Sequence, residues 1–170
     1  MSKFIEIIDF LIIQSPESFD LFIKYKPSDK FIRIEHKKQK FIIGYKEITE
    51  GESIDDGEFI KIIIDNHGYK ITNDIYGALS IYEASEGNLK YLSSSLPIII
   101  EKLRIKPNLD YERLHRYFAF GYHLVEHLTH FKNIKVFQEP VDISFYEGAF
   151  NLRIIHRDFF ETDNNINFEQ

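Results

Sequence analysis

The sequence predicts a single α+β domain rich in β-strands, and three observations support this fold class. Branched and aromatic side chains fit the half-buried surface of a sheet, and they are abundant here, with 16 Phe and 10 Tyr among 170 residues. The first half of the chain consists largely of short apolar segments separated by turns rich in Gly, Asn and Ser. Two segments with helical spacing follow, and strand patterns return after them. Strands grouped apart from helices favour an α+β fold over an alternating α/β fold.

Short apolar or alternating segments, each bounded by turn residues, predict the strands of this domain. In chain order they are residues 31–35, 41–45, 59–65, 69–73, 78–84, 89–93, 141–145 and 151–157. A polar turn over residues 37–39 predicts that the first two of these strands pair as a hairpin. The Gly87-Asn88 pair predicts a second hairpin, which joins 78–84 to 89–93.

Two helices are expected between the early and the late strands. The first covers residues 96–103, with a proline tolerated in its first turn. The second covers residues 111–120, and Asp110 precedes it as its N-cap. Three apolar residues fall on one face of the second helix: Leu114, Tyr117 and Phe118. The domain is expected to comprise residues 1–160, and the polar segment 161–170 is expected to form a linker or a flexible tail.

Charge and composition exclude several classes of function. The 21 Lys and Arg against 27 Asp and Glu give a net charge of −6, so no excess of positive charge is present to bind nucleic acid. The chain has no cysteine, which excludes disulfides, thiolate metal sites and a cysteine nucleophile. No glycine-rich phosphate loop is present, and no cofactor is predicted. The apolar runs are too short to cross a membrane, and the N-terminus lacks the pattern of a secretion signal. We therefore expect a cytoplasmic protein with neither nucleic acid nor a membrane as its partner.

The densest group of titratable residues is a set of histidines near the end of the second predicted helix. His123, His127 and His130 are spaced so that they would share one face if the helix continued through them. Three imidazoles on one face could bind zinc. The alternative is a surface segment that carries histidines incidentally. We predict no metal site, and keep the histidine trio as the alternative.

Serine supplies two candidate nucleophiles. Removal of Met1 would leave Ser2 with a free α-amine, which acts as a general base in N-terminal-nucleophile enzymes. The triple Ser93-Ser94-Ser95 precedes the first predicted helix, where serine is typical of helix capping. A nucleophilic serine at such a position is expected within a Gly-x-Ser-x-Gly turn, which this chain lacks. Only Ser2 therefore remains as a candidate, for the hydrolysis of an amide.

Five segments of the second half, taken in order, resemble the glutaminase domain of the asparagine synthetase family. They are residues 73–82 (NDIYGALSIY), 91–95 (YLSSS), 109–122 (LDYERLHRYFAFGY), 129–134 (THFKNI) and 155–160 (IHRDFF). The first resembles the family's Asp-x-x-Gly-x-x-Pro-Leu-Tyr-Tyr segment, with Ser80-Ile81 in place of Pro-Leu. The fourth is similar to the family's Thr-x-Phe-x-x-Ile loop.

This resemblance implies a fold and a set of residues. The expected fold is a trimmed N-terminal-nucleophile-hydrolase-like αββα sandwich, in which two antiparallel sheets stack face to face and helices lie outside them. The expected binding residues are those that match the family's motifs: Asp74, Gly77, Thr129 and Phe131. The family's glutaminase domain passes ammonia to a synthetase domain that uses ATP.

The chain departs from the family where the chemistry would occur. The family's cysteine nucleophile is replaced by Ser2, and Lys3 replaces the glycine that follows it. The segments that hold glutamine and the oxyanion have no match between Ser2 and Asp65, and their loss would remove roughly 3–4 kcal/mol of transition-state stabilisation.

We therefore expect a domain that is not an enzyme by itself. Its expected role is to support an asparagine-synthetase-like partner that forms amide, lactam or peptide-macrocycle bonds. That partner would lie either in the same polypeptide or in another, and a peptide substrate is a further candidate. The alternative is an amidohydrolase that uses Ser2.

Overall fold

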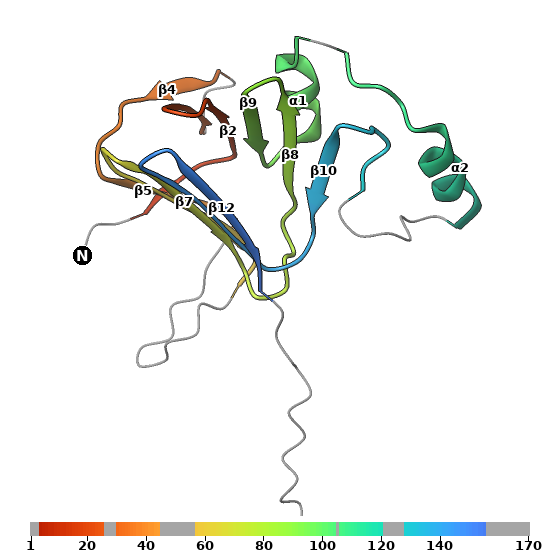
Figure 1. The fold of residues 1–170 in the computed structure, drawn as a ribbon. Helices are drawn as coiled ribbons and strands as arrows, with labels where there is room; N and C mark the ends of the chain where they lie inside the picture. The colour runs from red at the N-terminus through yellow and green to blue at the C-terminus, as the bar shows by residue number, and fades with distance from the viewer. Residues whose placement is uncertain (1–3, 26–29, 45–56, 105, 121–127, 156–170) are drawn as a thin grey trace, which may run out of the picture.

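The computed structural model describes residues 4–25, 30–44, 57–104, 106–120 and 128–155. Within them, two sheets of six strands stack face to face (Figure 1). The first sheet has the order β1 (Ile5–Glu6), β5 (Gln39–Gly44), β6 (Phe59–Ile64), β7 (Gly68–Asn73), β11 (Val141–Tyr146) and β12 (Ala149–Ile154). The second has the order β10 (Ile134–Phe137), β8 (Ile81–Glu86), β9 (Leu89–Ser93), β2 (Asp9–Gln14), β3 (Phe19–Lys24) and β4 (Ile32–Ile34). β1 runs parallel to β5, and the other pairs are antiparallel.

The core lies between the two sheets because alternate residues of each strand point inward. In β6, Ile60, Ile62 and Ile64 are all fully buried. In β2, Phe10 and Ile12 are equally buried and face them from the second sheet. Isoleucine and aromatic residues therefore fill the core between the sheets, and a second, smaller cluster lies between the second sheet and α1. The sheet-dominated α+β sandwich is confirmed.

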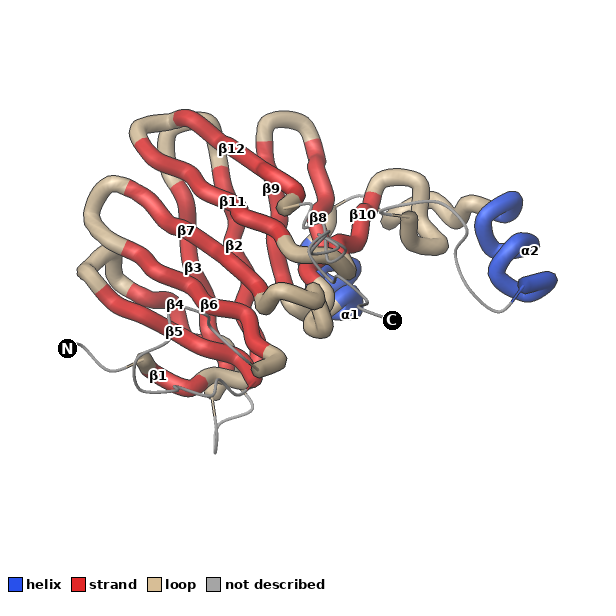
Figure 2. The backbone as a smooth tube through the Cα atoms, turned by 90° about the horizontal axis from the view of Figure 1, so that it is seen from below, coloured by secondary structure: helices blue, strands red, loops and turns tan. Residues whose placement is uncertain are grey.

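The helices lie on one side of this sandwich. α1 (Leu96–Lys102) packs on the outer face of the second sheet, over β8 and β9, and buries Ile99. α2 (Tyr111–Phe120) stands beyond β10, away from both sheets (Figure 2). The outer face of the first sheet has no helix over it among the described elements, and carries half-buried polar residues such as Lys61 and Asp142. Of the two helical layers expected for an αββα sandwich, the described residues show one.

One predicted pairing is wrong. The segment 31–35 contributes β4, which pairs with β3 in the second sheet, whereas 41–45 contributes β5, which pairs with β6 and β1 in the first sheet. The polar residues between β4 and β5 therefore carry the chain from one sheet to the other. This crossing lets β5 place Phe41 in the core opposite the second sheet, and Phe41 is fully buried.

The other elements lie close to their predicted positions. The hairpin of β8 and β9 forms around Gly87-Asn88 as expected, although β8 begins at Ile81 rather than at residue 78. The apolar segments before residue 26 provide β2 and β3, and β10 is a strand that the sequence patterns did not predict.

A polar contact crosses the core between the sheets. The hydroxyl of Tyr69 in β7 donates a hydrogen bond of 2.5 Å to Oε1 of Gln14 in β2. Nearby, Lys90 pairs with Glu83 at 2.7 Å, and its ammonium lies over the ring of Phe150. Burial raises the pKa of the Tyr69 hydroxyl well above its ordinary value, and the negative charge of Glu83 adds to that rise.

Replacing Tyr69 with phenylalanine should make the free energy of unfolding less sensitive to pH in the alkaline range. The folded protein holds the Tyr69 proton more tightly than the unfolded chain, so stability falls as the pH rises above about 10. Tyr69→Phe should remove up to about 1.4 kcal/mol per pH unit from that fall. It should also cost about 1–2 kcal/mol at neutral pH because Gln14 loses its partner. Urea unfolding between pH 7 and pH 11 measures both effects, and an unchanged slope above pH 10 would contradict the prediction.

Candidate functional site

The connection between β7 and β8 holds the first two residues expected to bind a ligand. Asp74 is fully buried, and its carboxylate accepts backbone hydrogen bonds on both oxygens. Oδ1 accepts from the amides of Tyr76 and Ala78 at 2.9 and 3.2 Å, and Oδ2 accepts from the amide of Phe59 at 3.3 Å. Three backbone donors thus depend on this carboxylate, which fixes the turn after β7.

Gly77 lets the same connection touch the chain beyond β10. Its φ angle is +64°, and a Cβ atom placed on it would lie 2.4–2.5 Å from backbone atoms of Glu139. Asn73 completes the contact, because its side-chain amide donates to the Glu139 carbonyl at 2.8 Å and its carbonyl accepts from the Val141 amide at 2.7 Å. Asn73 and Gly77 therefore hold the β7–β8 connection against the chain that follows β10.

Thr129 and Phe131 lie in the turn that leads into β10. The Thr129 side chain is 3% exposed, and its hydroxyl donates to the carbonyl of Ile134 at 2.8 Å. The same oxygen accepts from the amide of Phe131 at 3.1 Å. This turn precedes β10, whereas Gly77 meets the chain after β10. The structure therefore places the two expected pairs at opposite ends of one strand rather than in one pocket.

The remaining candidates divide between described and undescribed parts of the chain. Ser2, His123 and His127 lie outside the described residues, and nothing follows about them. The His130 ring packs 4.7 Å from the ring of Tyr117. Across the described ranges, no group of three or more His, Cys, Asp or Glu residues could hold a metal ion.

The serine triple bonds mainly to β2 rather than capping α1 with its side chains. Ser95 occupies the N-cap position of α1 without a capping hydrogen bond from its side chain, so the expected role of serine as a side-chain cap is wrong there. Instead, the Ser93 hydroxyl donates to the Phe10 carbonyl at 2.6 Å, and the Ser94 hydroxyl donates to Asp9 Oδ1 at 2.6 Å. These serines tie the end of β9 to β2.

The segment that carries α2 is anchored on the turn formed by residues 129–132. The Asp110 amide donates to the His130 carbonyl at 2.8 Å, and the Arg113 guanidinium donates to the Phe131 carbonyl at 3.2 Å. Asp110 also caps α2 as predicted, because its Oδ1 accepts from the Arg113 amide at 3.2 Å. Leu109 and Phe131 pair as an isolated β-bridge. Helix α2 is therefore held at its first turn.

The rest of α2 presents aromatic side chains to solvent. The helix covers the predicted range, but no residue in it is buried. Tyr111 is 75% exposed and Phe118 is 76% exposed. These two residues and Leu114 recur at i, i+3 and i+7, so they lie along one face, which we call the α2 face. Single exposed apolar residues are ordinary, whereas several on one face of a helix make that face a candidate interaction surface.

Comparisons with known proteins do not bear on this surface. No family model, no curated protein and no solved structure matches the chain. In the described part of the chain, no helix is long and apolar enough to cross a membrane. The periodicity of α2 indicated an apolar face in the sequence, and the structure adds that none of the described residues buries this face.

Proposed function

We propose that the protein is a non-catalytic, glutaminase-like domain that binds an asparagine-synthetase-like partner through the α2 face. The partner is an ATP-dependent enzyme that forms amide, lactam or peptide-macrocycle bonds. It lies either in the same polypeptide or in another. The observation that carries the proposal is the exposure of Tyr111 and Phe118 on a helix whose first turn is hydrogen-bonded to the turn before β10.

The structural arrangement supports a binding role over a catalytic one. The polar atoms of Asp74 and Thr129 are engaged by the backbone, so they act in holding the chain. Two of the segments that resemble the glutaminase family, 109–122 and 129–134, contact each other through the Leu109–Phe131 bridge. Together they build the base of α2. Two of the five segments that carry the resemblance thus form α2 and its base.

The chemistry of the α2 face indicates what the partner must offer. Aromatic anchors contribute most when they enter apolar pockets from which water is excluded. An amphipathic helix typically lies in a groove and uses residues at i, i+3 and i+7 as its anchors. The partner is therefore expected to present an apolar groove to Tyr111, Leu114 and Phe118. Glu112 and Arg116, paired on the same helix, would lie at the polar rim.

Changing both exposed anchors should abolish binding without unfolding the domain. The double variant Tyr111→Ser/Phe118→Ser should weaken binding to the synthetase-type protein by more than about 100-fold, because anchor residues each contribute 2 kcal/mol or more. Its free energy of unfolding should change by less than about 1 kcal/mol, because neither side chain is buried. Isothermal titration calorimetry and urea unfolding measure the two quantities.

The matched control changes an exposed tyrosine at the other end of β10. Tyr76 is 62% exposed, so Tyr76→Ser removes a comparable aromatic group away from the α2 face. This variant should bind the partner as the wild type does. Equal weakening by both sets of changes, or no binding of wild-type protein to a synthetase-type protein encoded beside it, would overturn the proposal.

A further inference from the structure

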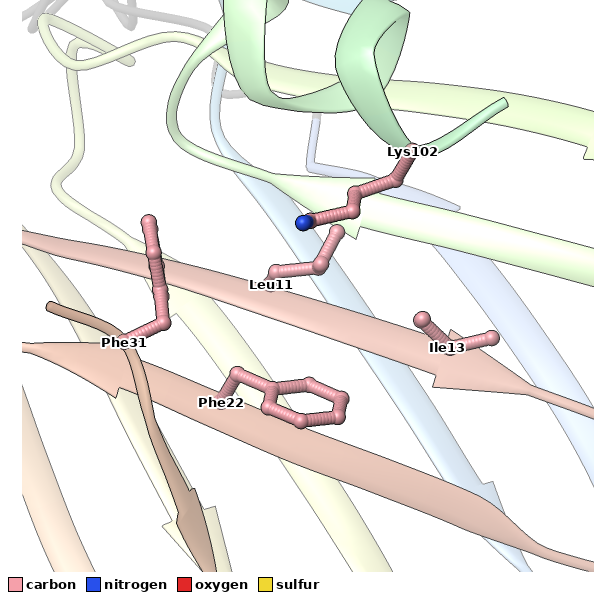
Figure 3. A pocket seen from close by; sticks show the side chains of 5 residues that line it. All are labelled: Leu11, Ile13, Phe22, Phe31 and Lys102. Atoms are coloured by element: carbon pink, nitrogen blue, oxygen red, sulfur yellow. The ribbon is translucent and has the colours of Figure 1, made fainter. Parts of the chain in front are cut away.

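A pocket of about 320 Å³ opens on the outer face of the second sheet, beside α1 (Figure 3). Its lining comes from four elements or segments: Leu11 and Ile13 of β2, Phe22 of β3, Phe31 just before β4, and Lys102 at the end of α1. The volume is at the lower end of the range for small-molecule sites, about 300–1,000 Å³. Strands β9, β8 and β10 lie between the strands of this pocket and α2 (Figure 2).

The pocket exists because α1 covers only part of an apolar surface. The helix lies over β8 and β9, and the outward-facing residues of β2 and β3 continue that surface past the helix. In the register of these strands, Leu11 stands opposite Phe22, so both side chains point to the same face. Leu11 is 2% exposed and forms the floor, whereas Ile13, Phe22 and Phe31 remain partly open to solvent.

Charge decides what could occupy this space. Among the described residues that line the pocket, Lys102 is the charged one, and Figure 3 shows its amine above Leu11, at the edge of the apolar surface. Its acidic neighbour is Glu101, whose Oε1 lies 3.0 Å from Lys102 Nζ and whose side chain is 72% exposed. Such an exposed pair between adjacent residues contributes little and exchanges readily with another anion. A cationic ligand would be repelled, and a neutral one would leave the ammonium unused.

We propose that this pocket binds an amphiphilic carboxylic acid, with its hydrocarbon or aryl part on Leu11, Ile13, Phe22 and Phe31 and its carboxylate on Lys102. Apolar contact supplies most of the affinity, and the ammonium selects the charge of the head group. This site is independent of the α2 face. Failure of the proposed ligand to bind here would therefore not contradict the proposed docking function, and the reverse also holds.

Three probes with the same ten-carbon chain test the selectivity: decanoate, decanol and decyltrimethylammonium, each below the concentration at which it aggregates. Isothermal titration calorimetry should show decanoate binding about fivefold more tightly than decanol, the size expected for a partly exposed charge pair. The cation should bind most weakly. Shortening the acid by one methylene should weaken binding by up to about fourfold, since a buried methylene is worth ~0.8 kcal/mol.

Variants at the rim locate the binding site. Lys102→Met keeps an apolar side chain but removes the charge, so it should weaken decanoate about fivefold and leave decanol unchanged. Glu101→Gln frees the ammonium from its neighbour and should tighten decanoate binding about twofold, a gain that misfolding cannot imitate. Lys38→Met, an equal loss of charge at an exposed position outside the pocket lining, is the control and should have no effect.

Clear outcomes would overturn the assignment. If decanoate does not bind, or binds no better than decanol, the carboxylate is not recognised by the charge of Lys102. Equal effects of Lys102→Met and Lys38→Met would show that net charge rather than this pocket governs binding. Unchanged or weaker binding by Glu101→Gln would show that Lys102 is not the anion's partner.

Discussion

Gly77→Ala is expected to lower the free energy of unfolding by about 3–5 kcal/mol, placing it among the most destabilising single changes. The left-handed backbone at φ +64° accounts for roughly 1–2 kcal/mol of this. The rest comes from the Cβ atom, which would lie 2.4–2.5 Å from the backbone of Glu139. The obstructing atoms belong to backbone that Asn73 holds by a hydrogen bond, so they cannot turn aside as a flexible side chain could. Urea unfolding followed by circular dichroism measures the loss.

Gly87 provides the control that separates the two contributions. Its φ angle is +59°, nearly the same as that of Gly77, but a Cβ atom there would meet nothing within 4 Å. Gly87→Ala should therefore cost only the conformational part, about 1–2 kcal/mol. If the two variants lose the same free energy of unfolding, the close contact between Gly77 and Glu139 does not contribute the destabilisation that we expect from it.

Asp74→Ala is expected to cost about 3–5 kcal/mol, because the fully buried carboxylate accepts from three backbone amides and its bond to the Phe59 amide is itself buried. Asp74→Asn should recover part of this loss, since one carbonyl oxygen remains to accept hydrogen bonds. Thermal and urea unfolding of both variants, compared with the wild type, give the two losses.

Asp65 is the matched control for Asp74. It accepts backbone hydrogen bonds from His67 and Gly68 at 2.8 and 3.0 Å, so its local chemistry is the same. Its turn is more exposed, and water can replace the carboxylate there. Asp65→Ala should therefore cost only about 1 kcal/mol. A loss as large as that of Asp74→Ala would show that burial is not what makes Asp74 important.

Local patterns in the sequence predicted the helices and strands better than they predicted which strands pair with one another. The range of α2 and the hairpin at Gly87-Asn88 follow from capping, spacing and turn residues, which are local properties. The pairing of β4 and β5 with different sheets depends on which distant surface buries Phe41, and no local pattern carries that information. The short strand β10 owes its place to β8, with which it pairs, rather than to its own four residues.

At the candidate site, too, the sequence predicted which residues are important but not what they contact. The motifs predicted that Asp74, Gly77 and Thr129 matter, and the structure gives each of them specific backbone contacts. What they do could not be predicted, because a carboxylate that accepts from amides and one that accepts from a ligand look alike in a sequence. Likewise, a helical apolar face has the same periodicity whether it is buried or exposed. The exposure of Phe118 depends on where α2 is anchored, which is a property of the whole fold.

The way β2 is inserted into its sheet governs how the chain can fold while it is being synthesised. The Ser93 hydroxyl bonds the Phe10 carbonyl across 83 residues of sequence, and β9 lies on one side of β2 while β3 lies on the other. At roughly 5–20 residues per second, the ribosome delivers β9 on the order of ten seconds after β2. Until then one edge of β2 has no strand to pair with, so the nascent β2–β3 hairpin exposes an adhesive edge. We expect the yield of folded protein to be limited by protection of that edge during synthesis rather than by the free energy of unfolding of the complete domain. Chains truncated before residue 93 should therefore aggregate.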